Sequence, residues 1–115
     1  MEQLPEQRPQ RFQQLDLRPV ANVDFRGSGG EGAIGWSGDD ENDLCNMPLG
    51  RQRFHDVDFD VIDPASNRRR ACIGLCSQGD YLRSASIPVG AKADSLYLLH
   101  TVAGGKGGLV GWFIV

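Results

Sequence analysis

The sequence lacks any apolar run that approaches the ~20 residues of a membrane-spanning helix, and residues Met1–Gln7 contain no apolar core of a signal peptide. Positive charge is also scarce, because 12 lysines and arginines against 15 aspartates and glutamates give a net charge of −3. Such a domain lacks the broad positive field that nucleic acid or an anionic membrane requires. We therefore expect neither as a partner, and we interpret the one basic run, Arg68–Arg70, as a solvated turn.

Paired cysteines and zinc motifs are missing as well. The three cysteines are Cys45, Cys72 and Cys76, and an odd number argues against a closed disulfide framework. Cys72 and Cys76 share one predicted strand, where a rise of ~3.3 Å per residue separates them by about 13 Å, beyond the roughly 7 Å that a disulfide allows. A bond from Cys45 to one of them stays open, and buried free thiols are the favoured interpretation. No metal site is expected, because no Cys-x-x-Cys is present.

No part of the sequence shows the apolar spacing of an amphipathic helix over a sufficient length. Short alternating segments separated by turns take its place, in keeping with 15 glycines and 6 prolines. The clearest strand is Phe54–Ile62, where apolar residues at 57, 59 and 61 alternate with aspartates at 56, 58 and 60. Further strands are predicted at residues 12–17, 23–25, 71–76, 84–89, 95–102 and 109–115. This pattern predicts one all-β domain, a sandwich or barrel, over residues 12–115, preceded by a flexible N-terminal tail at residues 1–11.

Two patterns look like enzyme or cofactor motifs but lack the necessary context. Gly27–Gly32 matches G-x-G-x-x-G, yet poor helix formers follow it, whereas a dinucleotide loop opens a helix. The aspartates of the 54–62 segment lie on a wet strand face, which does not separate the pKa values of a catalytic pair. No nucleophile elbow accompanies His55 or His100. We therefore expect no catalytic residues and no enzyme.

An acidic loop, Asp39–Asp43, follows a tryptophan. Its oxygen-rich side chains suit calcium, but the spacing is not that of an EF-hand, so we expect a solvated loop and no cofactor, with a structural calcium as the less favoured alternative. Trp36 precedes this loop and Tyr81 lies in another, whereas Trp112 lies in an apolar strand and is expected in the core. An exposed aromatic ring beside Asp and Asn side chains is typical of sugar binding, because the ring covers the apolar face and the side chains bind the hydroxyls.

Several short motifs resemble a known family. They are Gly35-Trp36-Ser37, Asn42-Asp43-Leu44, Met47-Pro48-Leu49-Gly50, Phe54–Pro64, Ile87-Pro88-Val89-Gly90 and Leu96–Thr101. Together they resemble a β-sandwich domain attached to bacterial polysaccharide-degrading enzymes, similar to the galactose-binding-like jelly rolls that include many carbohydrate-binding modules. The resemblance covers the chain from about Phe12 onward. It implies a two-sheet antiparallel jelly roll, here without a final strand, and a non-catalytic accessory role beside a glycoside hydrolase.

These observations lead to two hypotheses. The first is an accessory module that binds or positions carbohydrate through Trp36, Asp39, Asn42, Asp43, Arg53 and Tyr81. The alternative is a structural or assembly domain that docks on a catalytic domain, or dimerises through the strand ending at Val115, because an uncapped apolar edge invites pairing. The location is extracellular or periplasmic if the chain belongs to a secreted enzyme. Otherwise the chain is expected to stay in the cytoplasm.

Overall fold

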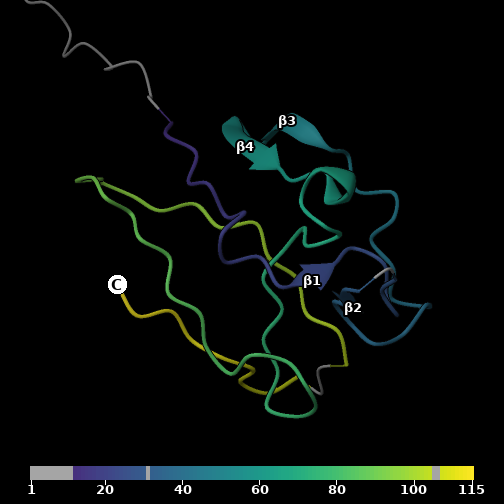
Figure 1. The fold of residues 1–115 in the computed structure, drawn as a ribbon. Helices are drawn as coiled ribbons and strands as arrows, with labels where there is room; N and C mark the ends of the chain where they lie inside the picture. Colours follow the sequence, from purple (N-terminus) through teal and green to yellow (C-terminus); the bar gives the residue numbers. More distant parts are fainter. Residues whose placement is uncertain (1–11, 31, 105–106) are drawn as a thin grey trace, which may run out of the picture.

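The structure, a computed structural model, describes residues 12–30, 32–104 and 107–115 and contains four short strands among them (Figure 1). Strand β1 (Val23–Asp24) pairs in parallel with β2 (Ile34–Gly35), and β3 (Gly50–Phe54) pairs antiparallel with β4 (Val57–Val61). One 3-10 turn, η1 (Pro64–Ser66), follows β4. Neither sheet has more than two strands, so the prediction of an all-β two-sheet jelly-roll sandwich over residues 12–115 is wrong. The predicted tail at residues 1–11 lies outside the described residues.

Strand β1 is the centre of the packed part of the molecule. Val23 and Asp24 are both fully buried. The carbonyl of Val23 accepts hydrogen bonds from the backbone N–H groups of Ala71 (2.8 Å) and Cys72 (3.2 Å), so the chain after η1 returns alongside β1. The residues that form the hydrophobic core around it are Ala21, Phe25, Val61, Ile62 and Ala71. The short strand predicted at residues 23–25 is confirmed, whereas the segment 71–76 forms isolated bridges rather than a strand.

The glycine-rich segment serves close backbone packing. A Cβ atom on Gly35 would overlap the backbone of Gly27, and one on Gly27 would overlap the backbone of Asp39. The N–H of Gly38 donates to the carbonyl of Gly27 over 2.7 Å. Because only glycine has no Cβ, these positions let the loop between β1 and β3 fold back on itself.

The hairpin β3–β4 keeps the predicted alternation over β4, but the prediction of one continuous strand over Phe54–Ile62 is wrong, because the chain turns between Phe54 and Val57. Phe54 belongs to β3 and pairs with Val57, so His55 and Asp56 form the two-residue turn, with φ of 49° and 63°. Asp56 therefore lies in the turn, not on the strand face of the other two aspartates. Across the strands Arg53 faces Asp58, with 3.5 Å between Nη1 and Oδ1, and the rings of Phe54 and Phe59 lie 6.1 Å apart.

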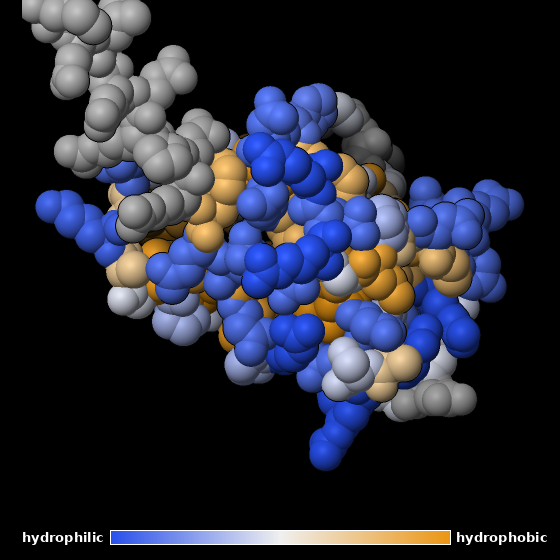
Figure 2. All heavy atoms as spheres, turned by 90° about the horizontal axis from the view of Figure 1, so that it is seen from above, coloured by the Kyte–Doolittle hydropathy of each residue, from blue (hydrophilic) through white to orange (hydrophobic). Residues whose placement is uncertain are grey.

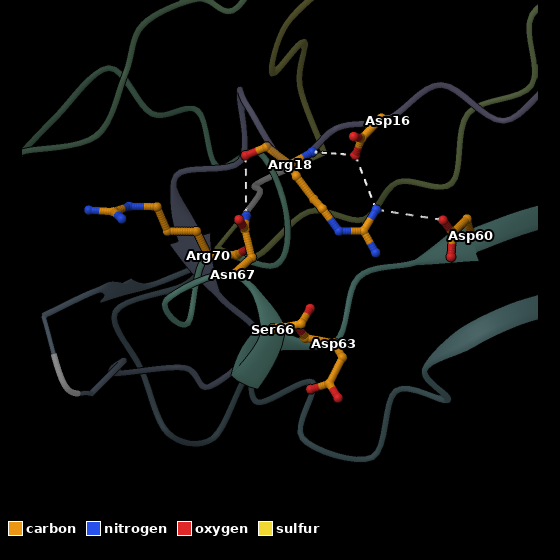
Figure 3. Close-up of polar contacts among 7 residues, drawn as sticks. All are labelled: Asp16, Arg18, Asp60, Asp63, Ser66, Asn67 and Arg70. Atoms are coloured by element: carbon orange, nitrogen blue, oxygen red, sulfur yellow. Dashed lines mark hydrogen bonds and ion pairs between the residues drawn. The ribbon is translucent and has the colours of Figure 1, made fainter.

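Polar contacts attach the segment before β1 to both the hairpin and η1 (Figure 3). The guanidinium of Arg18 lies between two carboxylates, 3.1 Å from Asp16 and 3.7 Å from Asp60 of β4. The side-chain amide of Asn67 donates to the carbonyls of Arg18 (3.2 Å) and Arg70 (2.8 Å). These contacts hold the turn after η1 against the segment that precedes β1.

Residues 84–104 and 107–115, which we call the C-terminal arm, form no strand and make no backbone–backbone hydrogen bond within the described residues. Figure 1 shows the chain running out to a tip and back without regular structure. The strands predicted at 84–89, 95–102 and 109–115 are therefore wrong, because an apolar run supplies strand propensity but not the neighbouring strand that it must pair with. Trp112 is 76% exposed instead of lying in the core.

The arm exposes eleven large apolar side chains: Leu96, Tyr97, Leu98, Leu99, Val102, Leu109, Val110, Trp112, Phe113, Ile114 and Val115. Among the described residues, the aromatic pair that links the arm to another segment joins Tyr97 to Phe12, with ring centroids 5.9 Å apart. On one face of the molecule, hydrophobic atoms reach the surface between hydrophilic flanks (Figure 2). The described residues thus combine a small packed centre with a large apolar surface.

The turn of the hairpin provides a test of the fold. Non-glycine residues in the left-handed region cost about 1–2 kcal/mol each, and two-residue hairpin turns with positive φ at both positions favour Asn-Gly. Replacing His55→Asn and Asp56→Gly together should raise the free energy of unfolding by about 1 kcal/mol, measured by urea denaturation. Asp56→Ala is the matched control and should not stabilise the protein. An unchanged urea midpoint in the Asn-Gly variant would contradict this turn assignment.

Candidate functional site

The acidic loop is organised by its own hydrogen bonds. The backbone N–H of Glu41 donates to Asp39 Oδ1 over 2.9 Å, and the side-chain amide of Asn42 donates to Asp39 Oδ2 over 3.0 Å. Ser37 Oγ accepts the N–H of Asp39 and lies 2.8 Å from the carbonyl of Asn42. The loop therefore presents exposed carboxylate and amide groups in a fixed arrangement.

Two aromatic residues flank this loop. The hydroxyl of Tyr81 donates to the carbonyl of Gly35 over 2.7 Å, so a residue 46 positions away lies directly beside β2. Trp36 follows Gly35, and its backbone N–H donates to the carbonyl of Asp24 over 3.0 Å. Both side chains are half-buried. The indole N–H of Trp36 is buried and has no hydrogen-bond acceptor among the described atoms.

Asp43, the last residue of the acidic loop, is hydrogen-bonded to Cys45. Its Oδ1 accepts the backbone N–H of Cys45 over 2.6 Å, and hydrogen bonding from the Cys45 side chain and backbone holds the pKa of the Asp43 carboxyl below its usual range. The same contact raises the pKa of the exposed Cys45 thiol. Because the thiolate is the nucleophilic form, this thiol is a poor nucleophile at neutral pH. All three cysteines are free, and Cys45 and Cys76 are exposed instead of buried as the sequence suggested.

Arg53 does not join the other predicted ligand residues. It lies on β3, where its guanidinium faces the carboxylates of Asp56 (3.9 Å) and Asp58 (3.5 Å). The structure therefore brings Tyr81 beside β2, which leads into Trp36 and the 39–43 loop, and leaves Arg53 in the separate hairpin. Figure 1 shows β2 and the hairpin β3–β4 as separate parts of the fold. A pattern of charges along the sequence carries no information about which face of the fold a strand residue will reach.

Sequence reasoning missed the one charged side chain that is buried among the described residues, Asp24. Asp24 is fully buried, and Arg69 binds it with both Nε (3.0 Å to Oδ2) and Nη2 (3.2 Å to Oδ1). The interpretation of Arg68–Arg70 as a solvated turn is thus wrong for Arg69, whose side chain is only 22% exposed. The sequence offers one hint of this buried carboxylate, a single aspartate between the apolar residues 23 and 25. The same alternation is equally typical of an aspartate that faces solvent from a strand.

The ion pair lies at a surface hollow of about 250 Å³ lined by Asp24, Phe25, Arg26, Cys45, Leu49, Asp63, Pro64 and Arg69. The two arginines and two aspartates balance in formal charge. The edge of Arg69 that would bind an anion is already occupied by Asp24. The hollow therefore has no free bidentate donor for an anionic ligand at this residue.

Within the described residues, no group of three His, Cys, Asp or Glu side chains is arranged to hold a metal ion. No helix in this part of the chain is long and apolar enough to cross a membrane. Comparison of the chain with models of protein families, with curated proteins and with solved structures gives no match. The resemblance to galactose-binding-like accessory domains therefore stays a prediction.

The buried ion pair predicts a large loss of stability when one partner is removed. Asp24→Asn leaves Arg69 without its counter-charge and should lower the free energy of unfolding by about 3–5 kcal/mol, enough to unfold a small domain. The matched control is Asp16→Asn, which removes an exposed partner of Arg18 and should cost less than about 1 kcal/mol. Urea denaturation followed by circular dichroism measures both. Equal urea midpoints for the two variants would contradict the assigned role of Asp24.

Cys72 predicts a loss of stability at high pH. Burial, with a smaller contribution from the Asp24 carboxylate, raises the pKa of this thiol from 9.0 to about 12. Above pH ~9 the unfolded chain loses this proton and the folded chain retains it, so stability falls with rising pH by up to ~1.4 kcal/mol per unit. Between about pH 8 and 10, Cys72→Ala should therefore lose about 1 kcal/mol less than the wild type in urea denaturation. Equal losses in the two proteins would show that this thiol does not contribute.

Proposed function

We propose that this chain is a non-catalytic module that binds a neutral, hydroxyl-rich carbohydrate on the surface formed by Trp36, the 39–43 loop and Tyr81. The observation that carries the proposal is that five of the six predicted ligand residues come together around one preorganised loop. Each contributes a group suited to a sugar. The aromatic rings offer apolar faces, and the carboxylates and the Asn42 amide offer hydrogen-bond partners for hydroxyls.

Preorganisation supports this role. The side chains of Asp39 and Asn42 are already fixed by hydrogen bonds within the loop, so little conformational entropy remains to be lost when a ligand binds. Each carboxylate retains acceptor capacity, since two oxygens offer about four lone-pair sites.

The negative charge of the 39–43 loop determines which class of sugar it favours. Four of the five residues from Asp39 to Asp43 are acidic, and the lowered pKa of Asp43 keeps its carboxyl ionised into the acidic range. This negative loop repels sulfated and uronic-acid sugars. Neutral sugars are therefore the expected ligands, with weak affinity for a single site that repeated copies on a polysaccharide would raise.

Binding to an array of neutral and acidic oligosaccharides, followed by calorimetric titration of the best ligand, tests the proposal. Trp36→Ala should weaken affinity about tenfold, because the loss of ring stacking is worth roughly 0.5–1.5 kcal/mol in addition to the lost contact area. Arg53→Ala is the matched control, since Arg53 lies on the hairpin, and it should leave affinity unchanged. Absence of binding to every neutral sugar, or equal affinity in the Trp36→Ala variant, would refute the proposal.

A further inference from the structure

Two segments of the C-terminal arm form an apolar surface without charged side chains. Residues 95–104 and 107–115 contain no Asp, Glu, Lys or Arg, and exposure of their large apolar side chains reaches 83% at Leu109 and 88% at Ile114. Monomeric proteins rarely expose contiguous apolar patches above a few hundred Å². Most surface segments carry charges that keep them solvated, so this composition indicates a surface that becomes covered.

The backbone of the arm points to the same conclusion. Within the described residues of the arm, no N–H or C=O group takes part in a backbone–backbone hydrogen bond. Backbone that makes no such bonds offers free donors and acceptors to an added strand. Leu, Val, Ile, Tyr, Phe and Trp dominate the two segments, and most of these residue types favour strands. The arm therefore carries side chains that favour strands and free backbone groups with which a strand of another chain can pair.

The exposed area matches what a stable interface needs. A single large aromatic side chain buries about 150–250 Å², so the eleven exposed apolar side chains together offer on the order of 1,000 Å². A standard specific interface buries about 800 Å² on each partner. The arm alone is thus large enough to form one complete side of such an interface.

We propose that a second copy of this chain covers the C-terminal arm, so that two arms pack and pair with each other in a symmetric homodimer. Residues 95–104 and 107–115 carry no charged side chain, so these segments can meet their identical copies without repulsion between like-charged side chains. A two-fold axis sets the same patch against itself and closes the assembly at two copies. One association step therefore covers the apolar arms of both chains.

Sedimentation and light scattering of the full chain test this proposal. The wild type should have twice the chain mass of 12.6 kDa at concentrations from about 1 to 100 µM. The double variant Trp112→Asp and Ile114→Asp should have the mass of a monomer, because two buried carboxylates oppose association. Leu75→Asp, at an exposed position outside the arm, is the matched control and should stay dimeric. A monomeric wild type, a dimeric double variant or open-ended oligomers would each overturn the proposal.

Fluorescence provides a readout that does not depend on the folding of the double variant. In Trp36→Phe the only tryptophan is Trp112, which is 76% exposed in the single chain. Its emission should shift to shorter wavelength as the protein concentration rises through the dimerisation range, because the ring leaves water. Emission typical of an exposed tryptophan at all concentrations would overturn the proposal.

Discussion

The structure depends on one buried ion pair, Asp24 with Arg69. An ionised carboxylate removed from water costs several kcal/mol unless an opposite charge and hydrogen bonds compensate it. Arg69 supplies two charge-assisted hydrogen bonds. It does so from a backbone in the left-handed region, with φ of 64° at Arg69 and 55° at Arg68. A non-glycine residue in this region costs about 1–2 kcal/mol of folding free energy. The strained turn places the guanidinium of Arg69 against Asp24, and the ion pair that forms there offsets the cost of the strain.

The same aspartate connects the core to the proposed sugar-binding loop. Its side chain fixes the turn after η1, and its backbone carbonyl accepts the N–H of Trp36. The next residue, Phe25, lies in the core and accepts the N–H of Leu44, which ends the acidic loop. Both ends of the loop are therefore hydrogen-bonded to β1 or to the residue that directly follows it. The rigidity that would let a short surface loop bind a sugar originates in the buried strand beneath it.

Local patterns predicted the local structure and little beyond it. The alternation over residues 57–61 depends on neighbouring residues, and the structure places β4 there. The turn at His55–Asp56 was missed because neither residue is the glycine or asparagine that marks such turns. The jelly roll was wrong for a different reason: a strand needs a partner, and no residue within an apolar segment specifies which distant segment that is. The Arg69–Asp24 contact spans 45 positions and was missed for the same reason.

The small core and the large exposed arm have one physical explanation in common. Five buried apolar residues form the core cluster, and a small domain with so little buried area gains little hydrophobic free energy against the entropy of ordering its chain. The apolar residues that a jelly roll would have placed inside lie instead on the arm. Covering them in a dimer adds burial at about 25 cal/mol per Å² to the folded state and none to the unfolded state. Folding and association are then linked, because the interface supplies apolar burial that the single chain does not achieve by itself.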